Sequence, residues 1–335
     1  MRKTVKRPTY CVTNGAFVSS FQICTPYRYT LKDNGGELKI ARNEIDGLLL
    51  RRPVARTLQP QDGRHKSGRL VAVENERDFL VCVSQFGHLR IAELARAIWP
   101  SGRCAEQMAQ RTASRLVRAG LLAVRKNALA TRSFVLTRRG AAFLEVRGIP
   151  ARHTLELSSV SGATFIHRSL ASRYLIEKQL DGKKVAGEYR LSNGDVPFQL
   201  ARLEQAAKKH PDGVTWSAIG GSQIGVDWIE VENAAKPLVA ISSILRVAEL
   251  IGASIDSEIG AVLRSLVIVF DGDQNHGRRI CKAANERWGN LPVNVRERYE
   301  RSIFVCRASM TFPLHWRGMS EISLHDLRRA SQAKK

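Results

Sequence analysis

The chain has 335 residues, 44% of them hydrophobic and 25% charged, and this composition excludes a largely disordered protein. Its length exceeds that of a typical single domain, so we expect two cores. The formal net charge is +22; residues 1–150 hold 27 basic and 11 acidic residues (+16), and residues 151–335 hold 26 and 20 (+6). This excess favours a polyanionic partner. Nucleic acid is favoured over a membrane surface, because no basic amphipathic helix beside a lipid anchor is evident.

Cysteine usage and hydropathy bear on where the protein is found. The six cysteines show neither CxxC nor Cys/His spacing, which favours free cytosolic thiols: Cys11, Cys24, Cys82, Cys104, Cys281 and Cys306. The basic N-terminus lacks the apolar stretch of a secretory signal. No apolar run reaches bilayer length, and the most apolar run, residues 265–270, is strand-sized. We therefore expect a cytoplasmic protein without membrane contacts.

Residues 1–75 are polar, basic and interrupted by Gly35, Gly36, Pro53 and Pro60, so we expect a basic N-terminal arm. Periodicity sharpens over residues 76–148. Apolar residues at helical spacing predict helices over residues 79–86 and 91–98, separated by a turn at 87–89 and ended by residues 99–102. A third helix is predicted over residues 105–119, followed by two short strands at 121–124 and 133–137.

The third helix is amphipathic. Its predicted buried face comprises Ala109, Thr112, Ala113 and Leu116, opposite a polar arc that also includes Gln110. With the strands that follow, this part of the chain resembles a winged helix-turn-helix, and residues 115–126 (RLVRAGLLAVRK) are typical of its third helix and wing. The resemblance implies that double-stranded DNA is contacted by the helix residues Gln107, Arg111, Ser114, Arg115 and Arg118 and by the wing residues Arg125, Lys126 and Arg132. A solvated helix face and a protein-docking module are the alternatives.

Residues 149–155, with Pro150, are expected to form a hinge into a second unit that ends near residue 310. There the pattern predicts helices at 165–180, 237–251 and 277–288, and a helix-rich linker at 196–209. Strands are predicted at 187–191, 213–217, 224–231, 266–270 and 302–307. This order predicts a mixed sheet flanked by helices, and the whole chain is expected to be α/β, with α+β character. Residues 311–335 are expected to be a basic C-terminal tail.

The second unit holds an acidic group within this basic chain. Asp212 opens one predicted strand, and Glu230 and Glu232 alternate along the next, so both glutamates point to one face. If the strands are neighbours, the three carboxylates converge and require a cation. Mg²⁺ suits such a site, with Asp212 and Glu230 as the metal ligands, Glu232 assisting and Lys236 near the attacking water. A plain solvent-facing strand is the alternative.

Other polar residues are weaker candidates. Glu177 and Glu188 could add carboxylates, and His167 could contact phosphate, although a structural role is favoured for it. The basic residues Arg168, Arg173 and Lys178 could contact phosphate or belong to a plain surface. Asp271, Gly272 and Asp273 predict a turn, with a phosphatase-type aspartate nucleophile as the alternative.

The second unit resembles the PD-(D/E)XK, or restriction-endonuclease-like, nuclease fold. The matching residues are PDG at 211–213 and IEVENAAK at 229–236, together with the order of elements. The resemblance implies a metal-dependent DNA endonuclease that uses Mg²⁺ or Mn²⁺, with Asp212, Glu230, Glu232 and Lys236 as its catalytic residues. The chain departs from the family pattern at Glu232, where the family has lysine, and Lys236 is the expected substitute.

A winged helix joined to such a domain resembles the replication-relaxation proteins of plasmids and integrative elements. That resemblance implies a DNA-binding factor of replication or conjugative mobilisation, with a relaxase or other mobilisation proteins as partners. The alternative is a non-catalytic regulator or relaxosome accessory factor that uses an inactive nuclease fold. RNA in place of DNA is a third possibility, and the sequence leaves the oligomeric state open.

Overall fold

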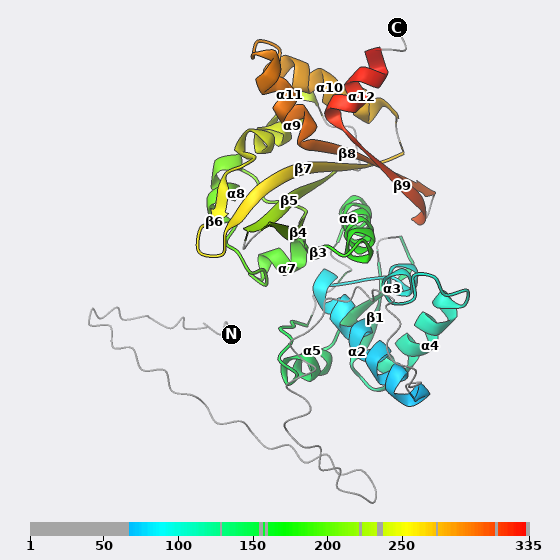
Figure 1. Ribbon diagram of the computed structural model, residues 1–335. Helices are drawn as coiled ribbons and strands as arrows, with labels where there is room; N and C mark the ends of the chain where they lie inside the picture. The colour runs from blue at the N-terminus through cyan, green and yellow to red at the C-terminus, as the bar shows by residue number, and fades with distance from the viewer. Residues whose placement is uncertain are drawn as a thin grey trace, which may run out of the picture. The chain divides into compact units, whose positions relative to one another are not determined.

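The computed structural model describes residues 67–127, 129–153, 157, 160–220, 223–232, 237–272, 274–311 and 314–332. These residues belong to one compact unit of the chain. The unit combines helices with a curled mixed sheet, which confirms the expected α/β class with α+β character (Figure 1). None of the described helices is long and apolar enough to cross a membrane. The expected N-terminal arm lies outside the described residues up to residue 66.

The first part of the described chain is a set of helices followed by an antiparallel hairpin, as the sequence predicts. The elements are α2 (Gly68–Phe86), α3 (Ile91–Ile98), α4 (Ala105–Arg118), β1 (Leu122–Lys126), β2 (Arg132–Leu136) and α5 (Arg138–Glu145). α2 begins within the expected arm, because the Ser67 hydroxyl caps the helix by accepting from the Leu70 amide. A backbone bridge between Leu89 and Phe134 joins the turn after α2 to the hairpin.

The predicted burial pattern of α4 is confirmed. Its buried residues are Ala109, Thr112, Ala113 and Leu116. Ala109, Ala113 and Leu116 belong with Phe79 to a core that α2, α3, the hairpin and α5 share. Helical spacing alone specifies this face, since residues three and four apart lie on the same side of a helix.

The second part is built on a mixed sheet whose strand order is β3-β4-β5-β7-β8-β9, with β6 paired to β7. β5, β7 and β8 are parallel to one another, and the other pairings are antiparallel. The strands are β3 (Lys184–Gly187), β4 (Gly213–Gly220), β5 (Gln223–Glu232), β6 (Ser254–Asp256), β7 (Ala261–Asp271), β8 (Ile303–Thr311) and β9 (His315–Ser323). The expected mixed sheet flanked by helices is therefore present.

Helices cover both faces of this sheet (Figure 1). They are α6 (Gly162–Leu180), α7 (Glu188–Ser192), α8 (Ala201–Ala207), α9 (Leu238–Leu245), the 3₁₀ helix η2 (Arg246–Leu250), α10 (Gln274–Trp288), α11 (Val293–Arg301) and α12 (Leu324–Gln332). Alternate residues of β5 serve different faces: Ile229 and Val231 share a core with α6, and Trp228 shares the other core with α9 and α10. This alternation is the period of two that a strand imposes.

Two sequence predictions are wrong. The strand expected at residues 187–191 ends at Gly187, and residues 188–192 form α7. The partner strand β4 begins at Gly213, directly after Pro211 and Asp212, so the pairing ends with the bond from the Glu188 amide to the Asp212 carbonyl. The expected basic tail over residues 311–335 instead supplies β9 and α12, with Leu324 buried beneath them. Charged residues interrupt the period-two pattern of this edge strand and hide it in the sequence.

The helical part packs directly on the sheet-bearing part. Gln85 donates from Nε2 to the Val185 carbonyl at 2.9 Å, and the His88 ring stacks on Phe165 with centroids 5.2 Å apart. The Arg96 guanidinium of α3 donates to both carboxylate oxygens of Glu177 in α6. The segment expected to be a hinge contributes a buried residue, Ala151, to the shared core.

Candidate functional site

Asp212 is held at the end of the sheet by backbone contacts on both sides. Its amide donates to the Ile229 carbonyl at 3.1 Å, and its carbonyl accepts from the Glu188 amide at 3.1 Å. Its carboxylate oxygen Oδ2 accepts from the Val231 amide at 2.8 Å. Since Gly213 pairs with Ile229 in the β4–β5 ladder, these bonds set Asp212 beside Glu230. β4 and β5 are neighbours, so the condition that the sequence analysis set for the approach of these carboxylates is met.

Glu230 is fully buried, with a relative accessibility of 0%. Trp228, two residues earlier on the same strand face, donates from Nε1 to Oε1 of Glu230 at 2.6 Å. The Lys209 ammonium lies 2.8 Å from Oε2. Lys209 follows α8 through Lys208, whose left-handed φ of 55° ends the helix and turns the chain back toward β5.

His167 approaches Asp212 from α6. Its Nε2 atom lies 2.9 Å from Oδ1 of Asp212. α6 lies close to β4 because Gly213 carries no side chain: a Cβ at that position would meet Leu175 at 2.9 Å. His167 is therefore a partner of a predicted site carboxylate, and 24% of its side chain remains exposed.

Burial and neighbouring groups shift the pKa values of the Asp212 and Glu230 carboxyl groups in opposite directions. Burial raises the pKa of the Glu230 carboxyl to about 7, and the adjacent Asp212 charge adds to the rise, while Lys209 opposes it. Burial would raise the pKa of Asp212 as well, but the hydrogen bonds from His167 and Val231 outweigh it and lower that pKa. Asp212 is thus the stable carboxylate of the pair, and Glu230 is able to hold a proton near neutrality.

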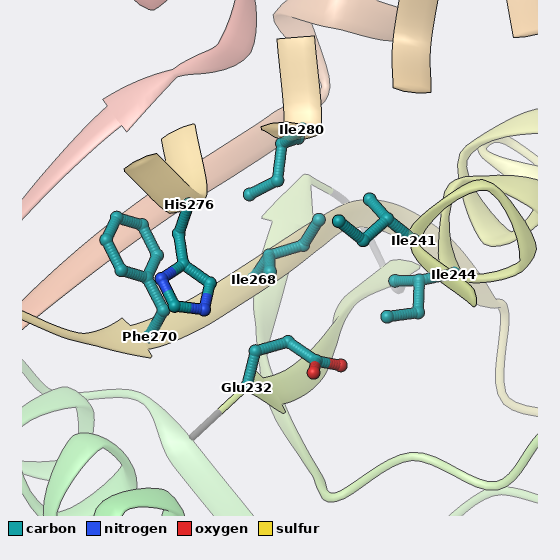
Figure 2. A pocket seen from close by; sticks show the side chains of 7 residues that line it. All are labelled: Glu232, Ile241, Ile244, Ile268, Phe270, His276 and Ile280. Atoms are coloured by element: carbon teal, nitrogen blue, oxygen red, sulfur yellow. The ribbon is translucent and has the colours of Figure 1, made fainter. Parts of the chain in front are cut away.

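Glu232 lies in different surroundings from Asp212 and Glu230. It is 5% exposed and lines a small apolar cavity of about 10 Å³, enough for one water. The other lining residues are Ile241, Ile244, Ile268, Phe270, His276 and Ile280 (Figure 2). The His276 ring stacks on Phe270, with centroids 5.2 Å apart, and Figure 2 shows the Glu232 carboxylate directed toward Ile244. The predicted site therefore divides into an ion-paired part and an apolar pocket.

The predicted metal ligands Asp212 and Glu230 do not fit a divalent cation as they stand. Among the described residues, no three His, Cys, Asp or Glu side chains are grouped so that they could hold an ion. Each oxygen of Asp212 and of Glu230 already faces a donor of the protein itself. Lys236, the predicted catalytic lysine, lies outside the described residues.

The additional acidic candidates are engaged elsewhere. Glu177 pairs with Arg96 and Arg173, and Glu188 pairs with Arg168. Lys178 pairs with Glu321 at 2.9 Å. At the end of β7, Gly272 has a φ of 48°, as expected for the predicted turn after Asp271, while Asp273 lies outside the described residues.

The predicted DNA-contact residues of α4 all lie on its exposed side: Gln107, Arg111, Ser114, Arg115 and Arg118. Arg115 also forms an ion pair with Glu76 of α2, with 2.7 Å between Nε and Oε1. The Ser114 hydroxyl donates to the Gln110 carbonyl at 2.8 Å. In the hairpin, Lys126 and Arg132 are exposed and Arg125 is half-buried. Both elements therefore present cationic side chains to solvent.

Sequence reasoning missed Lys209 and Trp228. Lys209 belongs to the run of basic residues just before Asp212, which is a visible signal, but only the folded chain shows that its side chain reaches Glu230. Trp228 stands two residues before Glu230, a spacing that places both on one face of β5. Searches of family models, of curated proteins and of solved structures found no match to the chain.

Proposed function

We propose that the protein binds double-stranded DNA through α4 and the β1–β2 hairpin, arranged as a winged helix-turn-helix. The observation that carries the proposal is the division of α4 into a fully buried small-residue face and an exposed face with three arginines. The hairpin that follows adds exposed Lys126 and Arg132. Cationic side chains on one helix and an adjoining hairpin suit the phosphate backbone and a groove of the duplex.

The sheet-bearing part is proposed to be a nuclease-like platform that binds without cleaving. The order α6-β3-β4-β5-α9-β7 supports the resemblance to the PD-(D/E)XK fold. Its paired carboxylates support a non-catalytic role, because Glu230 is fully buried and held by Trp228 and Lys209. The resemblance to replication-relaxation proteins suggests a role in plasmid replication or mobilisation in the cytoplasm, with a relaxase as a partner to test.

The test is DNA affinity measured on the full chain. Replacing Arg111 and Arg118 by alanine should weaken duplex binding by about 1–3 kcal/mol for each arginine that reads a base edge. An arginine that contacts only phosphate should instead lower the salt dependence of binding, with the slope of log affinity against log salt falling by about one. Electrophoretic mobility shifts at two salt concentrations distinguish these cases.

The matched control is Arg301→Ala, an arginine of α11 that is 64% exposed and pairs with Glu297 on the same helix. The Arg301→Ala variant should bind DNA with the same affinity as the wild type. Equal affinity of the Arg111→Ala/Arg118→Ala variant and the wild type would contradict the proposal. Competition with duplex RNA of the same sequence shows whether RNA is the preferred partner.

A metal-dependent endonuclease is the second candidate function, with Mg²⁺ or Mn²⁺ as the cofactor. The juxtaposition of Asp212 and Glu230 at the end of two neighbouring strands favours it. For a metal ion to bind there, the contact of His167 with Asp212 and the contact of Lys209 with Glu230 would have to break. Supercoiled plasmid incubated with the protein and either ion, beside Asp212→Asn and Glu230→Gln, decides the matter. Nicking by the wild type alone would establish the nuclease.

A further inference from the structure

We infer that Lys209 and His167 occupy the place of a divalent cation at Asp212 and Glu230, and that removing both creates a metal site absent from the wild type. These four residues together form the paired site. The inference rests on the proposed function, because it gives the reason why a nuclease-like domain would bind DNA without cleaving it. It concerns the chain's own side chains and is tested without DNA.

Each carboxylate oxygen of the paired site already lies beside a polar or cationic group of the protein. Glu230 faces the Trp228 indole at 2.6 Å and the Lys209 ammonium at 2.8 Å. Asp212 faces the His167 imidazole at 2.9 Å and the Val231 amide at 2.8 Å. A cation that bound both carboxylates would have to displace Lys209 and His167, because the other two donors belong to β5 itself.

Open volume in front of the Glu230 carboxylate is also lacking. Mg²⁺ requires octahedral coordination at about 2.1 Å and keeps several waters, so its carboxylate ligands need space around them. Glu230 has no accessible surface, and the ammonium of Lys209, whose side chain is 27% exposed, lies 2.8 Å from its carboxylate. A hydrated ion that approached the Glu230 carboxylate would therefore meet the Lys209 ammonium.

The same two side chains balance the charge of the paired site. Two adjacent carboxylates repel each other unless positive charge compensates them. Lys209 supplies one unit of charge directly, and the hydrogen bond from His167 stabilises the Asp212 carboxylate. With both partners removed, buried carboxylates remain unpaired and the fold is weakened. A divalent cation would then restore the lost compensation.

The experiment compares the wild-type full chain with Lys209→Met, His167→Gln and the double variant. Lys208→Met is the matched control, because Lys208 is the neighbouring lysine and is absent from the paired site. The probe is Mn²⁺ alone. The readouts are heat of binding by isothermal titration calorimetry and the midpoint of thermal unfolding.

The wild type and Lys208→Met should show no Mn²⁺ binding at this site and the same unfolding midpoint with Mn²⁺ or EDTA. The double variant should unfold at a lower temperature in EDTA, and Mn²⁺ should raise its midpoint as binding to the folded state requires. Adding Asp212→Asn to the double variant should abolish that rise.

Stoichiometric Mn²⁺ binding by the wild type that Asp212→Asn removes would overturn the inference. A folded double variant that does not respond to Mn²⁺ would overturn it as well. If the double variant does not fold, the single variants and the wild-type titration still show whether Mn²⁺ binding depends on the removal of Lys209 or His167. DNA affinity of Arg111→Ala/Arg118→Ala is independent of these readouts, so failure of the proposed DNA binding is recognised separately.

Discussion

At the scale of single residues, Asp227 and His88 show two outcomes for a buried polar group: full pairing with donors, and a pH-dependent cost. Asp227, 2% exposed, accepts hydrogen bonds from Thr215, Ser265 and Arg264 and pairs with Lys183, and this set of donors lowers its pKa despite burial. A carboxylate whose oxygens are all hydrogen-bonded in this way stabilises the sheet and is not available to bind a ligand. The carboxylates of the paired site are also held by partners, but those partners, His167 and Lys209, are only half-buried.

His88 gives a prediction for acid stability. Burial against Phe165 lowers its pKa to about 4, with Arg168 adding to the effect. A depressed folded-state pKa means that stability is full above the unfolded value of 6.5 and is lost as pH falls toward 4. The loss by pH 4 should approach ~3 kcal/mol, since a pKa difference of one between the folded and unfolded states corresponds to about 1.4 kcal/mol.

The measurement is the free energy of unfolding in denaturant at pH 7, 5.5 and 4. His88→Phe should flatten the acid limb, because the ring then cannot take up a proton. Exposed His153 serves as the control, and His153→Phe should keep the wild-type pH dependence. Parallel curves for wild type and His88→Phe would show that His88 is not the group responsible.

At the scale of elements, close backbone approaches decide where helices can dock. α5 packs against the chain leaving α4 through Gly140, where a Cβ would lie 2.1 Å from the Leu121 carbonyl oxygen. Thr137 caps the same helix by accepting from the Gly140 amide at 3.0 Å and donates to the Gly120 carbonyl at 2.6 Å. The hairpin and α5 are thus held to the end of the proposed recognition helix by a contact that only glycine allows.

Gly140→Ala should therefore destabilise the protein, because the backbone of Leu121 or α5 must move to accommodate the methyl group. We expect a cost in the upper part of the range for overpacked sites, about 1–3 kcal/mol, measured by the thermal unfolding midpoint. Gly68→Ala is the control, because a Cβ at this position near the start of α2 would meet no atom within 4 Å. Alanine there should be neutral or stabilise by roughly 0.5–1 kcal/mol. Equal effects of the two substitutions would refute the steric argument.

At the scale of the whole molecule, the helical part and the sheet share one continuous core. Phe79 and Leu80 of α2 belong to the same buried set as Ile229 and Val231 of β5. Glu177, 9% exposed, adds a polar connection by pairing with Arg96 and Arg173. The proposed recognition helix is thereby held at a fixed position relative to the paired site.

This shared core predicts one cooperative unfolding transition for the described unit, because neither part can lose its contacts alone. Glu177→Gln should leave Arg96 and Arg173 without their charge partner and cost roughly 3 kcal/mol. Differential scanning calorimetry should show a lower midpoint and a broader or divided transition. Glu145→Gln, at an exposed position of α5, should behave like the wild type. Two separate transitions in the wild type itself would disprove the coupling.

Local periodicity in the sequence determines much of the fold. The buried face of α4, the helix α6, and strands β4, β5 and β8 follow from spacings of 3.6 and 2 residues, and β7 follows from a short continuous apolar run. β9 is missed because its charged residues break the alternation, and α7 is mispredicted as a strand because apolar spacing over five residues fits both a helix and a strand.

For the candidate site, the sequence by itself identified Asp212 and Glu230 and set them on consecutive strands, and the structure shows that these strands are neighbours. Which side chains neutralise them was decided only by the tertiary structure. Lys209 and Glu230 are far apart along the chain, and they meet because the turn at Lys208 directs the chain toward β5. His167 reaches Asp212 because a glycine at position 213 lets α6 lie against β4. Local propensity carries no information on such contacts, since they depend on how whole elements pack.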